Sequence, residues 1–128
     1  MIVAGLGCRR GTPLEALEAA ISLACEQAGI TRNLISALAT GIIKKDEPAI
    51  VELAQRLNLH LHIVGDEELK AAEPKTRTVS QHSLAITDSP SLSEAAALAI
   101  AGDGAALIAA RVVAQGATCA LARSEQAP

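Results

Sequence analysis

The chain of 128 residues contains no phenylalanine, tryptophan or tyrosine, although half of its residues are hydrophobic. It therefore lacks the ring faces on which aromatic cages, single-strand nucleic-acid platforms and membrane-interface belts rely. The apolar content comes instead from 27 Ala, 16 Leu, 11 Ile and 6 Val, which is enough for the core of one globular domain. A flat ligand would have to be held without aromatic stacking.

The sequence also lacks a polybasic run, a long apolar segment and paired cysteines. Its 11 basic and 14 acidic side chains leave a net charge of −3, which argues against a nucleic-acid partner. No run of about 18 apolar residues exists, and no basic segment precedes Ile2 to Leu6, so we expect a cytoplasmic protein without a membrane partner. Cys8, Cys25 and Cys119 lack the spacing of a zinc site or a disulfide framework and are interpreted as free thiols.

Short apolar runs alternate with helical patterns along the first half of the chain. The expected strands are residues 2–6, 34–40 and 59–63, each followed by a helix. In the first helix, Leu17, Ile21 and Ala24 recur at helical spacing, and Gly29 is the expected stop. In the third strand, Leu59, Leu61 and Ile63 form an apolar face that alternates with His60 and His62. This alternation is typical of an α/β domain.

Capping signals indicate where the helices begin. Capping boxes are expected at Thr12 to Glu15 and at Ser91 to Glu94, with Pro13 at the first helical position of the first helix. Asp46 and Asp66 are the expected N-caps of the second and third helices.

The last part of the chain predicts a different arrangement. Residues 71–83 are expected to form a surface loop and residues 84–87 a weak strand. Apolar runs at 106–112 and 117–122, separated by Gln115-Gly116, predict a closing β-hairpin. The whole pattern predicts a single three-layer α/β/α domain over residues 1–123, with a mixed, mainly parallel sheet, a C-terminal β-hairpin and a polar tail at 124–128.

Polar segments at 5–12, 40–47 and 91–94 follow expected strands or open expected helices. In open α/β sheets, ligands lie beyond the carboxyl ends of the strands. Helix N–H groups, together with Arg9, Arg10, Lys44 and Lys45, would attract an anion with several carboxylates or phosphates there. In the alternative interpretation, the glycines only permit a tight turn and the basic side chains are solvated.

Each residue that could take part in catalysis or metal binding also has a purely structural interpretation. The glycines match neither a P-loop nor a dinucleotide fingerprint, so no cofactor is expected. Cys8 beside two arginines is a candidate nucleophile, although small buried cysteines are common. Asp46, Glu47 and Glu94 could each act as acid or base, or could belong to the cap and first turn of a helix. His60 and His62 could hold a metal, but without a third ligand nearby a solvated face is favoured, and no metal site is predicted.

Three segments together resemble one family: GLGCRRGTPLEALEAAI, ATGIIKKDEPAIVELAQRL, and SLSEAAAL followed by TCALAR. They resemble the CobE family of cobalamin biosynthesis, which is similar to the C-terminal domain of CbiG, over nearly the whole chain. The resemblance implies a carrier of corrin-ring intermediates, such as precorrins and hydrogenobyrinic acid, with other cobalamin-pathway enzymes as further partners. Larger CbiG-type proteins open a lactone on a cobalt-precorrin and release acetaldehyde. A hydrolase of that type, or a docking module, is therefore the alternative to a non-catalytic carrier.

The resemblance also implies which residues hold the ligand. The carboxylate rim of a corrinoid precursor would pair with Arg9, Arg10, Lys44 and Lys45. The other expected binding residues are Gly7, Cys8, Gly11, Thr12, Thr40, Asp46, Glu47, Ser93 and Glu94. The chain departs from the family pattern at Ala49, where relatives often have glycine, and at Arg111, where many have lysine.

Overall fold

A computed structural model describes residues 1–42, 47–72, 76, 92–102 and 104–124. Five strands form one sheet in the order β3-β2-β1-β5-β4. They are β1 (Ile2–Cys8), β2 (Ala37–Gly41), β3 (Leu61–Val64), β4 (Ala106–Ala114) and β5 (Ala117–Arg123). β1, β2 and β3 run parallel, whereas β5 is antiparallel to both β1 and β4. The predicted mixed sheet with a closing hairpin is confirmed.

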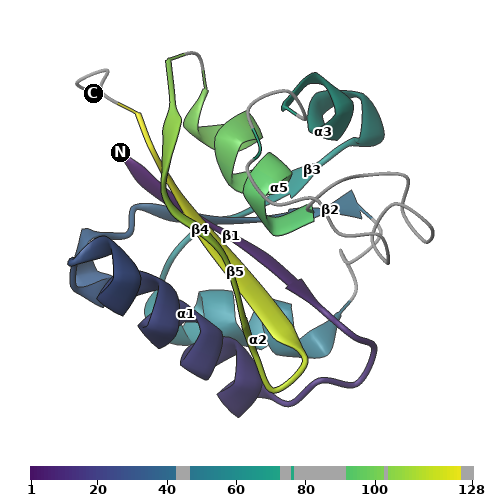
Figure 1. Cartoon of the computed structure of the whole chain (residues 1–128). Helices are drawn as coiled ribbons and strands as arrows, with labels where there is room; N and C mark the ends of the chain where they lie inside the picture. Colours follow the sequence, from purple (N-terminus) through teal and green to yellow (C-terminus); the bar gives the residue numbers. More distant parts are fainter. Residues whose placement is uncertain (43–46, 73–75, 77–91, 103, 125–128) are drawn as a thin grey trace.

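Helices cover both faces of this sheet (Figure 1). α1 (Leu14–Ala28) and α2 (Pro48–Leu57) lie on one face, while α3 (Asp66–Ala72) and α5 (Leu92–Ala101) lie on the other. A short 3-10 helix, η1 (Arg32–Leu34), precedes β2. The predicted α/β/α layering is therefore confirmed.

The two layers of core differ in the size of their side chains. Fully buried residues on the α1 and α2 face include Leu6, Leu17, Ile21, Leu38, Ile50 and Leu53. Fully buried residues on the α5 face include Ala39, Ala95, Ala96, Ala97, Ala120 and Ala122. Because alanine fills little space, α5 must lie closer to the sheet than α1 and α2 do.

Glycines in the strands allow this close approach. A Cβ on Gly5 would lie 1.9 Å from the Ser93 carbonyl oxygen and 2.9 Å from the Ala97 nitrogen. A Cβ on Gly41 would lie 2.5 Å from Leu92 Cδ1. The predicted end of the first strand at Leu6 is wrong, because β1 continues through Gly7 to Cys8. The glycines of β1 make room for a helix, which the sequence pattern did not indicate.

Three of the predicted helix starts are also wrong. The N-cap of α1 is Pro13, without a side-chain cap, because the Thr12 hydroxyl donates to the Arg9 carbonyl at 2.7 Å instead. The N-cap of α2 is Glu47 and not Asp46, which lies outside the described residues. Ser91 of the second capping box, the strand predicted at 84–87 and nearly all of the loop predicted at 71–83 lie outside them as well. α3 begins at Asp66 itself, since the Leu69 N–H donates to the Gly65 carbonyl at 3.0 Å, so Asp66 is the first helical residue and not the N-cap.

The strands of the second and third units begin later than predicted. Residues 32–34 form η1, in which the Ile35 N–H donates to the Arg32 carbonyl at 3.0 Å, so β2 starts only at Ala37. Ile63, a member of the apolar face predicted for the third strand, has an exposed fraction of 40%. The physical reason is that β3 forms one end of the sheet.

The closing hairpin turns at the two residues that the sequence placed between its strands. Gln115 and Gly116 have φ angles of 53° and 91°, the combination that a type I′ turn requires. At the other end of the hairpin, the Ser124 N–H donates to the Met1 carbonyl at 2.9 Å. Ser124, the first residue of the predicted polar tail, is buried there, and residues 125–128 lie outside the described residues.

Candidate functional site

The ends of β1 and β2 and the starts of α1, α2 and α5 meet at one edge of the sheet, which we call the carboxyl edge. Leu92, the first residue of α5, lies over both strand ends, 3.7 Å from a Cβ built on Gly7 and 2.5 Å from one built on Gly41. The Gly11 N–H donates to Glu47 Oε1 at 3.1 Å, which joins the loop after β1 to the start of α2. Among the described residues, the structure thus brings together parts of all three polar segments that the sequence predicted for the site.

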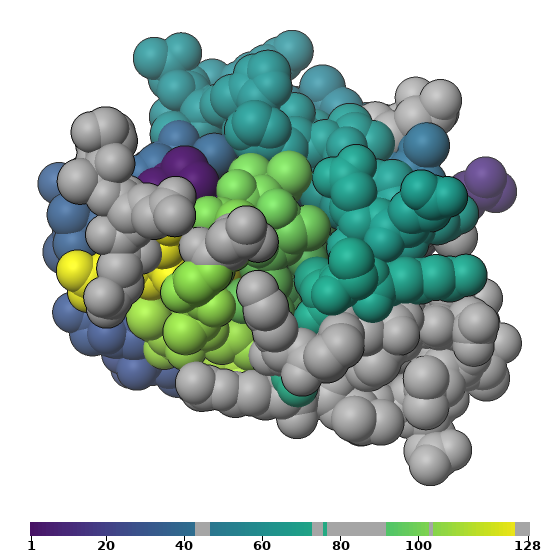
Figure 2. All heavy atoms as spheres, turned by 90° about the horizontal axis from the view of Figure 1, so that it is seen from above, coloured from purple at the N-terminus to yellow at the C-terminus, as the bar shows by residue number. Residues whose placement is uncertain are grey.

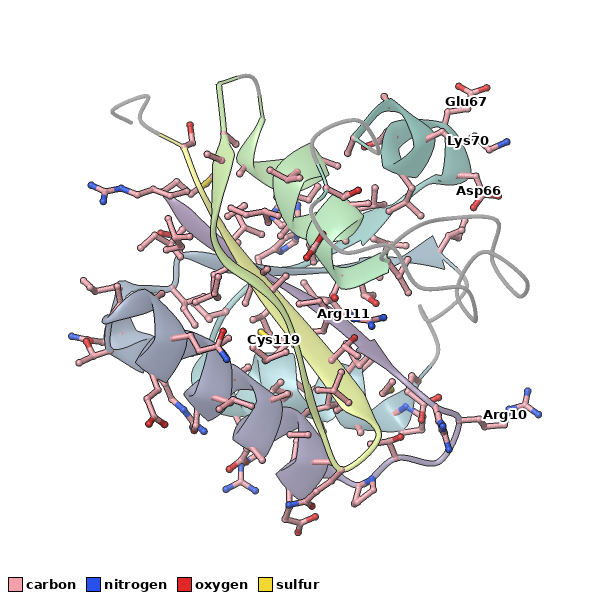
Figure 3. The ribbon with its side chains drawn as sticks, viewed as in Figure 1. Arg10, Asp66, Glu67, Lys70, Arg111 and Cys119 are labelled. Atoms are coloured by element: carbon pink, nitrogen blue, oxygen red, sulfur yellow. The ribbon has the colours of Figure 1, made fainter. Side chains whose placement is uncertain are left out.

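Arg9 and Arg10 are exposed at this edge. They lie in the turn between β1 and α1, and Figure 3 shows the Arg10 side chain extending away from the sheet. The Arg9 N–H donates to the Gly116 carbonyl at 3.4 Å, so the loop after β1 is hydrogen-bonded to the turn between β4 and β5. Lys44 and Lys45, the other two predicted cations, lie outside the described residues, as does Asp46.

Several of the polar side chains that were predicted to bind a ligand are buried and hydrogen-bonded within the protein. The Thr40 hydroxyl is fully buried and donates to the Leu6 carbonyl at 2.8 Å. The Thr12 hydroxyl donates to Arg9, and the Glu47 carboxylate accepts from Gly11. The hydroxyl protons of Thr12 and Thr40, which we expected to reach a ligand, are therefore engaged in shaping the edge.

The first turn of α5 holds two fully buried polar side chains, Ser93 and Glu94. Glu94 Oε2 accepts a hydrogen bond of 2.8 Å from the Arg111 N–H, beside the irregular register between β4 and β5. Within the part of the chain that the structure describes, the buried Ser93 Oγ and Arg111 Nε have no hydrogen-bond partner. Figure 2 shows α5 at the centre of this face of the molecule, with α3 beside it.

Arg111 is not among the residues that the sequence predicted for the site. Its side chain reaches from β4 toward the α5 side of the sheet (Figure 3). The signal that could have found it is a charged residue in the middle of an otherwise apolar strand, ALIAARVVA. A cation there needs solvent or an acidic neighbour, because an unpaired charge is costly to bury.

The three cysteines are buried, and none of them forms a disulfide, as their spacing in the sequence predicted. Burial raises the pKa of the Cys25 thiol despite the opposing charge of Arg32. Burial, and secondarily Cys25, also raises the pKa of the Cys119 thiol, which lies between the sheet and α1 in Figure 3. Cys25 and Cys119 are therefore protonated at neutral pH and act as packing residues.

Two further features lie away from the carboxyl edge. The rings of His60 and His62 lie next to each other at β3, the edge strand of the sheet, with their centroids 4.4 Å apart. A groove of about 420 Å³ lies between α2 and β3, lined in part by Gln55, Asn58 and Leu59. Among the described residues, no group of three or more side chains could hold a metal ion, and no helix has the length and apolarity to cross a membrane.

Comparison with known proteins assigns the chain to a family. The cobalamin synthesis G C-terminus family matches residues 2–122. Protein CobE of Sinorhizobium sp is 33% identical over 121 residues, which cover 94% of this chain and 79% of that protein.

Solved structures agree with this match. The crystal structure of CobE, a protein from the cobalamin (vitamin B12) biosynthetic pathway, is 35% identical with a TM-score of 0.91 and covers 100% of this chain and 93% of its own. Cobalamin biosynthesis protein chiG from Agrobacterium tumefaciens is 44% identical with a TM-score of 0.77, over 98% of this chain and 100% of its own. These matches extend from β1 to β5 and show that the chain belongs to the cobalamin synthesis G C-terminus family and is a protein of cobalamin biosynthesis.

Proposed function

We propose that this protein binds and carries intermediates of the corrin ring at its carboxyl edge. The observation that carries the proposal is the joint exposure of Arg9 and Arg10 where two strands end and three helices begin. Corrinoid precursors are flat macrocycles with a rim of acetate and propionate carboxylates. Guanidinium groups bind carboxylates through paired, charge-assisted hydrogen bonds, and helix N-termini favour the same charge.

The ring itself would rest on aliphatic surface, since the chain has no aromatic side chain. Leu92 is half-buried over the ends of β1 and β2 and offers such a surface beside the arginines. The proposed site therefore binds the carboxylates of the macrocycle through charged side chains and contacts the plane of the ring through aliphatic side chains. Lys44 and Lys45, next along the chain from β2, would extend the charged rim.

A carrier function also agrees with the structure around the two candidate catalytic residues, Glu47 and Cys8. Glu47, a candidate acid or base, holds the loop after β1 through Gly11. Cys8, the candidate nucleophile, is only 9% exposed at the end of β1. Both residues have structural roles, which favours binding over hydrolysis.

Titration with hydrogenobyrinic acid tests the proposal. Since the protein has no Trp, Tyr or Phe, absorbance changes above the peptide and thiol region report on the ligand alone. We expect saturable binding at one ligand per chain. A spectrum that changes only in proportion to added ligand would overturn the proposal.

The double variant Arg9→Ala/Arg10→Ala locates the site. We expect about tenfold weaker binding at low salt and a smaller loss at high salt, because screening weakens the charge contribution. Arg123→Ala is the matched control, since Arg123 is exposed at the opposite end of the sheet. Equal losses in the two variants would place the ligand elsewhere.

A hydrolase of the CbiG type makes a different prediction for the same mixture. With a precorrin-5-type substrate, a carrier returns the ligand unchanged, whereas the hydrolase releases acetaldehyde. If the protein releases acetaldehyde and the Glu47→Gln variant does not, the protein is an enzyme of this type and not a carrier.

A further inference from the structure

The two histidines at β3 lie on one face of an edge strand. Residues two apart in a strand project to the same side, and the His60 carbonyl accepts from the Leu38 N–H at 3.0 Å, so His60 continues the strand geometry. The ring centroids are 4.4 Å apart, with an angle of 69° between the ring planes. His60 is exposed and His62 is half-buried. Neither residue lies at the carboxyl edge or contributes to the proposed corrin site.

The spacing of the rings matches that of two imidazoles bound to one metal ion. Each ligating nitrogen would lie about 2.1 Å from the ion, and each ring centroid about 1.1 Å farther out. A right angle at the ion then places the two centroids about 4.5 Å apart. Rotation about the second side-chain torsion of histidine is soft, so both nitrogens can turn toward one ion without movement of the backbone.

We propose that His60 and His62 form a chelating site for a divalent first-row transition ion of the Ni²⁺ and Cu²⁺ class. Imidazole nitrogen suits these ions, and their tetragonal geometry supplies the right angle that the ring spacing requires. Since His60 is exposed, water completes the coordination shell. Mg²⁺ prefers oxygen ligands and is excluded by the same donor set.

Calorimetric titration of the untagged protein with Ni²⁺ at pH 7.5 tests this site. We expect one Ni²⁺ per chain and no heat of binding with Mg²⁺. His60→Ala and His62→Ala should each weaken binding by about tenfold or more, because each removes one arm of the chelate. His82→Ala, the change of the third histidine of the chain, should leave the affinity unchanged.

Circular dichroism of each variant verifies that the fold is retained, which is expected for side chains on a solvated strand face. Proton NMR of the parent protein should show loss of the His60 and His62 ring signals on addition of Ni²⁺. Absence of binding to the parent, or affinities of His60→Ala and His62→Ala equal to that of the parent, would overturn the proposal. Since none of these readouts involves a corrin ligand, failure here leaves the proposed function unaffected.

Discussion

The two faces of the sheet are closed by different means. Under α1 and α2, leucine and isoleucine side chains such as Leu17, Ile21 and Leu53 fill the space. Under α5, alanines pack over strand glycines, and the Ser93 carbonyl lies where a Cβ on Gly5 would be. A chain without aromatic side chains can fill its core with branched side chains or bring backbones together, and this protein does one on each face.

The difference predicts how each face responds to substitution. Removing atoms from the α1 and α2 face leaves a cavity whose cost grows with its volume. The α5 face has no room for a single added methyl group at Gly5, because the nearest atoms belong to the helix backbone. The α5 face also fixes Leu92 and Ser93 at the carboxyl edge, so its packing sets the shape of the proposed site.

Gly5→Ala should produce the largest effect. The new Cβ would clash with the Ser93 carbonyl and the Ala97 nitrogen, neither of which can rotate away, so we expect a loss of about 4 kcal/mol or more in unfolding free energy. Urea denaturation followed by circular dichroism measures it. Gly65→Ala is the control, since its Cβ would meet only Glu68 Oε1 at 3.8 Å and should change stability by less than about 0.5 kcal/mol. Equal stabilities of the two variants would contradict backbone packing of α5.

Leu53→Ala tests the other face. Leu53 is fully buried in the core under α2, and its truncation should cost about 3 kcal/mol through lost burial and a cavity. Leu57→Ala, on the same helix but only partly buried, should cost less than half as much in the same denaturation experiment. A loss below about 1 kcal/mol for Leu53→Ala would show that this face does not depend on side-chain volume.

Ser93→Ala should have the smallest effect and the opposite sign. The Ser93 hydroxyl is fully buried without a partner among the described residues, so removing it should raise the unfolding free energy by about 1 kcal/mol. Thr40→Val is the matched comparison, because the Thr40 hydroxyl is equally buried but donates to Leu6. It should cost about 1 kcal/mol by leaving the Leu6 carbonyl unsatisfied. If both variants lose stability equally, the Ser93 hydroxyl has a partner in solution.

Local signals in the sequence predicted much of the fold. The helical spacing of Leu17, Ile21 and Ala24 and the stop at Gly29 define α1, and Gly29 does adopt a left-handed conformation, with a φ of 71°. The hairpin was predicted from Gln115-Gly116 between two apolar runs. These features are local, because they depend on neighbouring residues and their own backbone preferences.

The candidate site was predicted only in part. Arg9, Arg10 and Glu47 could be placed at the carboxyl edge because strand ends and helix starts follow from local patterns. The engagement of Thr40 with Leu6 and the pairing of Glu94 with the backbone of Arg111 could not be predicted. Each joins residues far apart in the chain, so it depends on strand order and on the distance of α5 from the sheet.

The sequence by itself determined the class of fold, the alternation of strands and helices, and the need to hold any flat ligand without aromatic rings. Composition and local periodicity carry this information, because they reflect the burial and backbone preferences of each residue. The tertiary structure decided that α5 packs against Gly5 and Gly41, and that the Arg111 side chain reaches the α5 side of the sheet. These outcomes depend on which surfaces meet, and only the packing of distant segments establishes that.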